Sequence, residues 1–122
     1  MPGIKMKWLR QKDFWTYWEN SNSKAKIDFE NWCYFRISEP ALRNLIGDIS
    51  PNQNLEGEDD PPGPVSRWYG NLNGIHIILD FHQSHPNGEV VILYHDERPE
   101  SRAEVREHFV RWGEDWQESE IA

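Results

Sequence analysis

Five ionisable side chains in the middle of the chain have types and spacings that could do chemistry. They fall between residues 66 and 96, a stretch that also holds four of the five histidines. The five are Arg67, His76, Asp80, His82 and His95. Asp80 lies four positions after His76 and His82 two positions after Asp80, so in a β-strand all three side chains point to the same face. This pattern predicts a polar site on one face of a sheet.

Two kinds of chemistry fit such a site. If two-residue turns join the strands, Arg67, Asp80 and His95 form a transverse row. An aspartate between an arginine and a histidine stays ionised and raises the pKa of the imidazole, which suits a general acid. Alternatively, His76, Asp80 and His82 could converge on a metal ion.

A structural role fits the same residues. Opposite charges on neighbouring strands stabilise the exposed side of a sheet by about 0.2–1 kcal/mol per pair. Because the sequence offers no nucleophile, glycine-rich anion loop or second carboxylate nearby, we favour this role and expect neither a metal ion nor a cofactor. His82 and His85 are three residues apart but would need a third ligand to hold zinc, and His108 is assigned no role.

Two Asn-Gly pairs place the site on a three-stranded antiparallel meander. Asn73-Gly74 and Asn87-Gly88 are strong hairpin signals, because a type I′ turn needs positive φ at both central residues. Two-residue turns would set Arg67 opposite Asp80, and Asp80 opposite His95. Pro86 leaves a wider second loop open as an alternative, and a one-residue change there would move His95 to the other face.

The opposite face of the meander is strongly apolar, and a C-terminal helix is expected to cover it. The predicted apolar face consists of Ile75, Ile77, Leu79, Phe81, Val90, Ile92 and Tyr94. The helix is predicted over 97–119, where Ser101 and Glu104 match a capping box and Gly113 is a point of interruption. Its apolar stripe repeats at helical spacing in Val105, Phe109, Trp112 and Trp116.

Shorter elements complete an α+β fold. We predict strands over 4–9 and 25–37, a helix over 12–19, and a helix near 39–49 with Ser38 as its N-cap. Residues 50–64 are rich in proline, glycine and acids, and are predicted to form an irregular loop. The expected architecture is a single domain in residues 1–122, with an antiparallel meander of about four to five strands.

A formal net charge of −8 narrows the classes of partner. Proteins that bind nucleic acids or anionic membranes carry basic surfaces, so neither partner is expected. The single cysteine, Cys33, cannot form an internal disulfide, and its aromatic neighbours indicate a buried, unreactive thiol. With no paired cysteines and no apolar run suited to a signal peptide or a bilayer span, we expect a cytoplasmic protein.

Acids and tryptophans together predict a surface for a basic protein partner. Charge steers the encounter of two proteins, and aromatic rings supply much of the affinity. The predicted contact residues are Glu56, Glu58, Asp59, Asp60, Trp68, Glu114, Asp115 and Trp116. An acidic surface that serves only solubility is the alternative.

The two ends of the chain resemble bacterial polymorphic-toxin immunity proteins. The resemblance lies in Trp8-Leu9, in the pair Trp15 and Trp18, and in the closing segment Phe109-Val110-Arg111-Trp112 after a strand meander. Proteins of this kind are small, acidic, cytoplasmic α+β domains rich in tryptophan. The resemblance implies a stoichiometric inhibitor that blocks a basic toxin, often a nuclease, through an acidic surface. It transfers no functional residue by motif.

Two other functions stay open. A small enzyme or metal-binding protein would use the histidine-bearing face of the sheet. A structural or regulatory subunit of a larger assembly would expose an apolar patch on the sheet face away from the helix. The expected members of that patch are Tyr69, Ile78 and Leu93.

Overall fold

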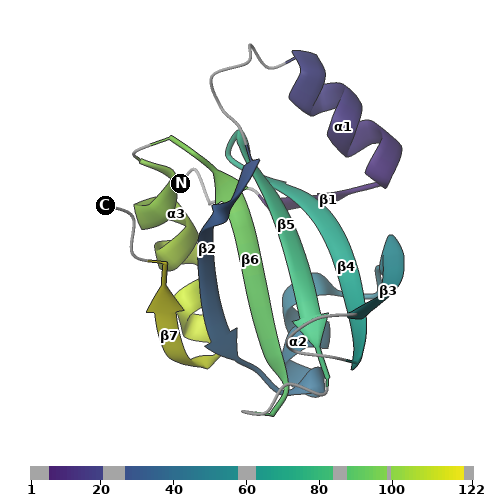
Figure 1. The fold of residues 1–122 in the computed structure, drawn as a ribbon, viewed down its shortest axis with the longest axis vertical. Helices are drawn as coiled ribbons and strands as arrows, with labels where there is room; N and C mark the ends of the chain where they lie inside the picture. The colour runs from purple at the N-terminus through teal and green to yellow at the C-terminus, as the bar shows by residue number, and fades with distance from the viewer. Residues whose placement is uncertain (1–5, 21–26, 58–62, 84–87, 99, 120–122) are drawn as a thin grey trace.

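In the computed structural model, seven strands form one β-sheet with helices on both of its faces (Figure 1). The structure describes residues 6–20, 27–57, 63–83, 88–98 and 100–119. In chain order the elements are β1 (Met6–Leu9), α1 (Gln11–Asn20), β2 (Ile27–Arg36), α2 (Glu39–Ile46), β3 (Gln53–Gly57), β4 (Gly63–Leu72), β5 (Ile75–His82), β6 (Val90–Asp96), α3 (Ser101–Phe109), the short 3₁₀ helix η1 (Val110–Trp112) and β7 (Glu114–Glu118).

The sheet is antiparallel, with the strand order β1, β4, β5, β6, β2, β7. Strand β3 also pairs with β4, along the half of β4 that β1 does not reach. The predicted α+β class and C-terminal helix are confirmed, but the strand count is higher than predicted. The two additional strands lie where other structure was predicted: β3 in the loop of 50–64, and β7 in the helix of 97–119.

The first hairpin of the meander has the predicted register. Asn73 and Gly74 have φ values of 51° and 90°, as the turn between β4 and β5 requires. The side chain of Asn71 accepts a hydrogen bond of 2.8 Å from the backbone N–H of Gly74. Arg67 therefore lies opposite Asp80.

The second hairpin does not have the predicted register. His82 pairs with Val90, so the seven residues 83–89 connect β5 to β6 in place of a two-residue turn. Asp80 consequently faces Ile92 instead of His95. Because the register shifts by an odd number of residues, three, every side chain of β6 lies on the face opposite to the predicted one. Pro86, which has no N–H to donate to a ladder, falls inside the connection. Val91, Leu93 and His95 thus lie on the face predicted for Val90, Ile92 and Tyr94.

The C-terminal helix is shorter than predicted. Glu100 occupies the N-cap position without a side-chain hydrogen bond, and Ser101 is the buried first residue of α3, so the predicted capping box is wrong. Helix α3 ends at Phe109, and η1 continues the chain to Trp112, just before Gly113 crosses β2 closely. A Cβ at Gly113 would lie well inside contact distance of the Arg36 carbonyl oxygen and the Phe35 ring. The chain then extends as β7, which pairs with β2.

The main core lies between the sheet and the helices α2 and α3, as predicted for the C-terminal helix. Helix α3 contributes Val105 and Phe109, both fully buried, and α2 contributes Leu42 and Ile46. Trp112 and Trp116 are partly buried against the same core. Ionic contacts also hold β7 to α3. Arg106 donates hydrogen bonds to the carboxylate of Glu118, and these bonds lower the pKa of Glu118 to about 2.

Helix α1 covers part of the opposite sheet face (Figure 1). Its Phe14 is fully buried and packs against Tyr69 at a ring-centroid distance of 4.8 Å. Tyr69 and Ile78 are each 2% exposed and Leu93 is fully buried, so the apolar patch predicted for a subunit of a larger assembly is not exposed. Among the described helices, none has the length and apolarity that crossing a membrane would require.

Helix α2 begins as the sequence predicts. The Ser38 side chain accepts a hydrogen bond of 3.3 Å from the N–H of Ala41, and Pro40 lies in the first turn. The helix ends at Gly47, whose φ of 83° is costly for residues with a Cβ. It is three residues shorter at its C-terminal end than the predicted 39–49.

Replacing Gly113 with alanine tests the close crossing of β7 over β2. We expect Gly113→Ala to lower the free energy of unfolding by about 1–3 kcal/mol, because the new methyl group forces rigid backbone apart. Urea unfolding followed by circular dichroism measures this loss. Glu114→Ala, at the exposed neighbouring position, is the control and should change stability by less than about 0.5 kcal/mol. Equal stability of the two variants would contradict the close crossing.

Candidate functional site

The predicted polar row begins with an ion pair on the sheet face that α1 partly covers. Arg67 donates two hydrogen bonds to the carboxylate of Asp80, from Nε to Oδ1 (2.6 Å) and from NH2 to Oδ2 (2.7 Å). The side chains are 19% and 5% exposed. The carboxylate raises the pKa of Arg67 above its ordinary value. Ile92, not His95, lies on the other side of Asp80, so the predicted row ends there.

His95 lies on the opposite face of the sheet, among the core residues. It is 1% exposed, and its Nδ1 lies 3.2 Å from Nδ2 of Asn31. Asn31 also donates to the backbone carbonyl of Asp96 (2.6 Å), and Arg102 donates to the Asn31 side chain. Arg102 reaches Ser119 as well. His95 is therefore part of a buried network that joins β2, β6, α3 and the end of β7.

His76 has a partner that the sequence analysis missed. The Asp96 Oδ2 atom accepts from the backbone N–H of His76 (2.8 Å) and lies 3.3 Å from Nδ1 of the same residue. Arg98 donates to that oxygen as well (3.0 Å). The seven-residue connection between β5 and β6 brings Asp96 beside His76, whereas the predicted two-residue turn would not.

In the described part of the chain, the side chains predicted to bind a metal ion do not form a metal site. His76, Asp80 and His82 share a sheet face, as predicted. Within residues 6–20, 27–57, 63–83, 88–98 and 100–119, no group of three His, Cys, Asp or Glu side chains is placed to hold a metal ion. His85, the predicted companion of His82, lies outside those residues. Cys33 is buried as expected, and burial raises the pKa of its thiol.

The predicted partner-binding residues whose side chains the structure describes do not all lie at the surface. Trp68 is 7% exposed and donates from its indole to the Ile49 carbonyl (3.0 Å), so it is a core residue and the prediction of an exposed anchor is wrong. Trp116 stacks on Phe35 at 5.4 Å between ring centroids. Glu114 and Asp115 are exposed, and Asp115 forms an ion pair with Arg36 (3.0 Å). Glu56 lies on β3, but its side chain is not among those described. Residues 58–60 lie wholly outside the described residues.

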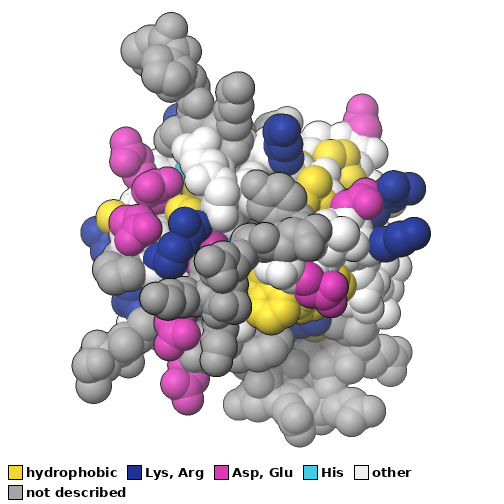
Figure 2. Space-filling view, turned by 90° about the horizontal axis from the view of Figure 1, so that it is seen from above, with side chains coloured by type: hydrophobic (Ala, Val, Ile, Leu, Met, Phe, Trp, Pro, Cys, Tyr) yellow, Lys and Arg dark blue, Asp and Glu magenta, His cyan; other side chains and the backbone are white. Residues whose placement is uncertain are grey.

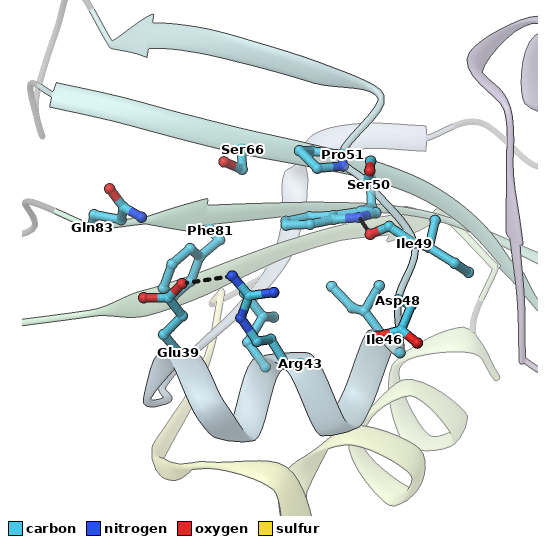
Figure 3. A pocket seen from close by; sticks show the side chains of 13 residues that line it. Glu39, Arg43, Ile46, Asp48, Ile49, Ser50, Pro51, Ser66, Phe81 and Gln83 are labelled. Carbon is cyan, nitrogen blue, oxygen red and sulfur yellow. Dashed lines mark hydrogen bonds and ion pairs between the residues drawn. The ribbon is translucent and has the colours of Figure 1, made fainter.

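A pocket of about 400 Å³ lies between α2 and the strands β4 and β5 (Figure 3). Four buried apolar side chains line its inner part: Leu42, Ile46, Trp68 and Phe81. Ile49 also lines the pocket, but it is 46% exposed. The pocket therefore has an apolar interior and an exposed apolar residue beside it, which is the arrangement that receives an anchor side chain in protein interfaces.

Charged side chains surround the apolar interior. Glu39 and Arg43 extend from α2 toward the strands and pair with each other at 3.1 Å (Figure 3). Asp48 lies at the other end of α2, next to Gly47. Asp48 is in no ion pair with the arginines and lysines that the structure describes. Two carboxylates and one guanidinium give this rim a formal charge of −1.

A second group of acids lies along α3. Glu100, Glu104 and Glu107 share one side of the helix, and Glu97 precedes them. In the part of the chain that is described, none of these four carboxylates is in an ion pair, although six other acids pair with arginine. A groove of about 250 Å³ runs between Glu104, Glu107 and the turn at Leu72 and Asn73. On the left of Figure 2, the side on which α3 lies in Figure 1, acidic side chains gather beside a few basic ones.

No protein-family model, curated protein or solved structure matches the chain. The residues that combine accessibility with chemistry are those of the α2 pocket and the acidic side of α3. Neither was identified from the sequence. The signal for the pocket is the apolar spacing of Leu42 and Ile46 on α2, and the signal for the acidic side is the spacing of Glu100, Glu104 and Glu107.

Removing one partner of the Arg67–Asp80 pair tests its structural role. We expect Asp80→Leu to lower the free energy of unfolding by about 3 kcal/mol, because it leaves a largely buried guanidinium without its counter-charge. The double variant Arg67→Met/Asp80→Leu should recover most of that loss, since it removes both charges. Guanidinium-chloride unfolding of the three proteins measures both effects. A double variant as unstable as the single one would contradict this account.

The histidines predict how stability depends on pH. Burial lowers the pKa of His95 below its ordinary value of 6.5, and burial also lowers that of His108. The unfolded chain therefore takes up protons near pH 6.5 that the folded chain does not, so stability is fully present above this pH and falls as the pH drops below it. The loss approaches about 1.4 kcal/mol per pH unit for each such group.

Urea unfolding at pH 7.5, 6.5 and 5.5 measures this dependence. The variant His95→Asn should show a smaller fall between pH 6.5 and 5.5 than the unmodified protein, because asparagine does not titrate. His108→Asn separates the contribution of the second histidine. A fall that neither substitution reduces would show that these histidines do not cause it.

Proposed function

We propose that the protein is a non-enzymatic binding domain of the immunity or inhibitor type, which neutralises a basic protein partner. The α2 pocket carries this proposal. It is open, it has an apolar interior, and Ile49 stands exposed beside it. Pockets of this kind bind the central anchor residues of a partner, where most of the affinity of an interface resides.

The state of the ionisable groups supports binding over catalysis on the sheet. Asp80 accepts both hydrogen bonds that Arg67 donates, which fixes the carboxylate in a strand-to-strand contact. His95 is on the opposite face from Asp80, so the two cannot act as an acid–base pair. His76 contacts Asp96 in a site that is 1% exposed or less. These groups hold strands together.

The distribution of charge supports a basic partner. The chain has a net charge of −8, and the carboxylates of Glu97, Glu100, Glu104 and Glu107 have no ion pair with the described arginines and lysines. Exposed carboxylates without a counter-charge attract a basic protein from a distance and raise the rate of association. The interaction is screened over about 10 Å at 0.1 M salt.

Substituting Ile49 tests the role of the pocket. Partners are first captured from the source organism on the immobilised protein, and each captured protein is then purified and titrated. We expect Ile49→Asp to weaken binding by at least ~10-fold, as for a central interface residue. Val110→Asp is the matched control, because Val110 is 42% exposed but does not line the pocket. It should leave affinity within about twofold.

Charge reversal completes the experiment. Glu104→Lys with Glu107→Lys should slow association and reduce its dependence on salt, whereas Glu19→Lys on α1 should have a smaller effect. The absence of a saturable protein partner would contradict the proposal. So would a partner whose affinity is equal for Ile49→Asp and Val110→Asp, or one whose affinity does not change between 50 and 300 mM salt.

A further inference from the structure

Four apolar side chains line the inner part of the α2 pocket. They are Leu42, Ile46, Trp68 and Phe81, and each is no more than 7% exposed, so only a small apolar area is accessible. A small accessible apolar area suits the methylene stem of an aliphatic side chain, because an aromatic ring needs a larger area of contact. The cavity of about 400 Å³ has room for one long side chain.

The end of the pocket at Gly47 and Asp48 favours a positive charge. The C-terminal end of α2 lies there, and the last carbonyl groups of a helix carry partial negative charge. Asp48 adds a carboxylate, which no described basic side chain neutralises, since the one arginine of the rim pairs with Glu39. Ser50 and the backbone of the following loop add neutral oxygen atoms. A carboxylate and the end of a helix thus lie together at one end of the pocket, and its lining also includes neutral oxygen atoms.

We infer that the α2 pocket takes a lysine side chain of the partner, with its methylene stem among Leu42, Ile46 and Trp68 and its ammonium group at Asp48. A lysine head is a compact point charge with three donors, which single acceptors at scattered directions can satisfy. This inference rests on the proposed function, because it names the partner group that enters the pocket.

Three small probes test the inference without the partner. They are the N-acetyl, N′-methylamide derivatives of lysine, norleucine and glutamate, which share a backbone and differ in the end of the side chain. The indole N–H of Trp68 donates to the Ile49 carbonyl and so reports on the pocket. Its resonance, assigned by comparison with Trp68→Phe, is followed by ¹H–¹⁵N NMR at low salt. We expect saturable shifts with lysine, with an affinity about fivefold above that for norleucine, and none with glutamate.

Two substitutions at exposed positions test the charges. Asp48→Asn should weaken lysine binding about fivefold and leave norleucine binding unchanged. Arg43→Gln should strengthen lysine binding, because it removes the one positive charge of the rim. Glu19→Gln on α1 is the control for a lost negative charge elsewhere. Thermal unfolding of each variant shows whether the fold is retained, and the loss of an exposed helix pair at Arg43 costs only about 0.3–0.5 kcal/mol.

Three outcomes would overturn the inference. Norleucine could bind as well as lysine, Asp48→Asn could leave lysine binding unchanged, or no probe could shift the Trp68 resonance. None of these affects the test of the proposed function, which measures the whole partner against Ile49→Asp. Conversely, a partner indifferent to Ile49→Asp would overturn the proposed function even if the pocket selects lysine among the probes.

Discussion

The burial of β5 on both faces is the constraint on which the rest of the structure depends. All eight residues of this central strand are buried. A strand in that position must satisfy its polar side chains inside the protein, because a buried polar group without a partner costs about 1–3 kcal/mol and an unpaired charge costs more. Asp80 meets this requirement through Arg67 on β4, and His76 meets it through Asp96 on β6.

The same constraint separates structural from functional chemistry. The ionisable residues that suggest catalysis in the sequence belong to strands inside the sheet, where Arg67 pairs with Asp80 and His76 contacts Asp96. Accessible chemistry lies instead at the periphery, in the α2 pocket and along α3. There, apolar side chains lie beside carboxylates. Glu39 pairs with Arg43, but the other carboxylates form no ion pair with a described arginine or lysine. A binding function follows more directly from these features than from the histidines.

Prediction succeeded where a few adjacent residues decide the structure. Asn73-Gly74 supplies positive φ at both turn positions, which sets the register of Arg67 against Asp80. Ser38 caps α2 by accepting a hydrogen bond from the backbone N–H of Ala41, three residues further along the chain. Prediction failed where distant parts of the chain compete. The repeat of Trp112 and Trp116 is helical in the sequence, yet Gly113 lies against β2 and the chain gains more from pairing with that strand.

The sequence by itself determined the α+β class, the first hairpin, the position of α2 and the presence of a helix over the sheet, because local turn chemistry, capping and apolar periodicity suffice for these. Only the tertiary structure decided the face on which His95 lies, the partner of His76, the burial of Trp68 and the pocket beside α2. Each depends on a register or a close approach between segments far apart in the chain. A shift of three residues between β5 and β6 changes no local preference, but it reverses every side chain of a strand.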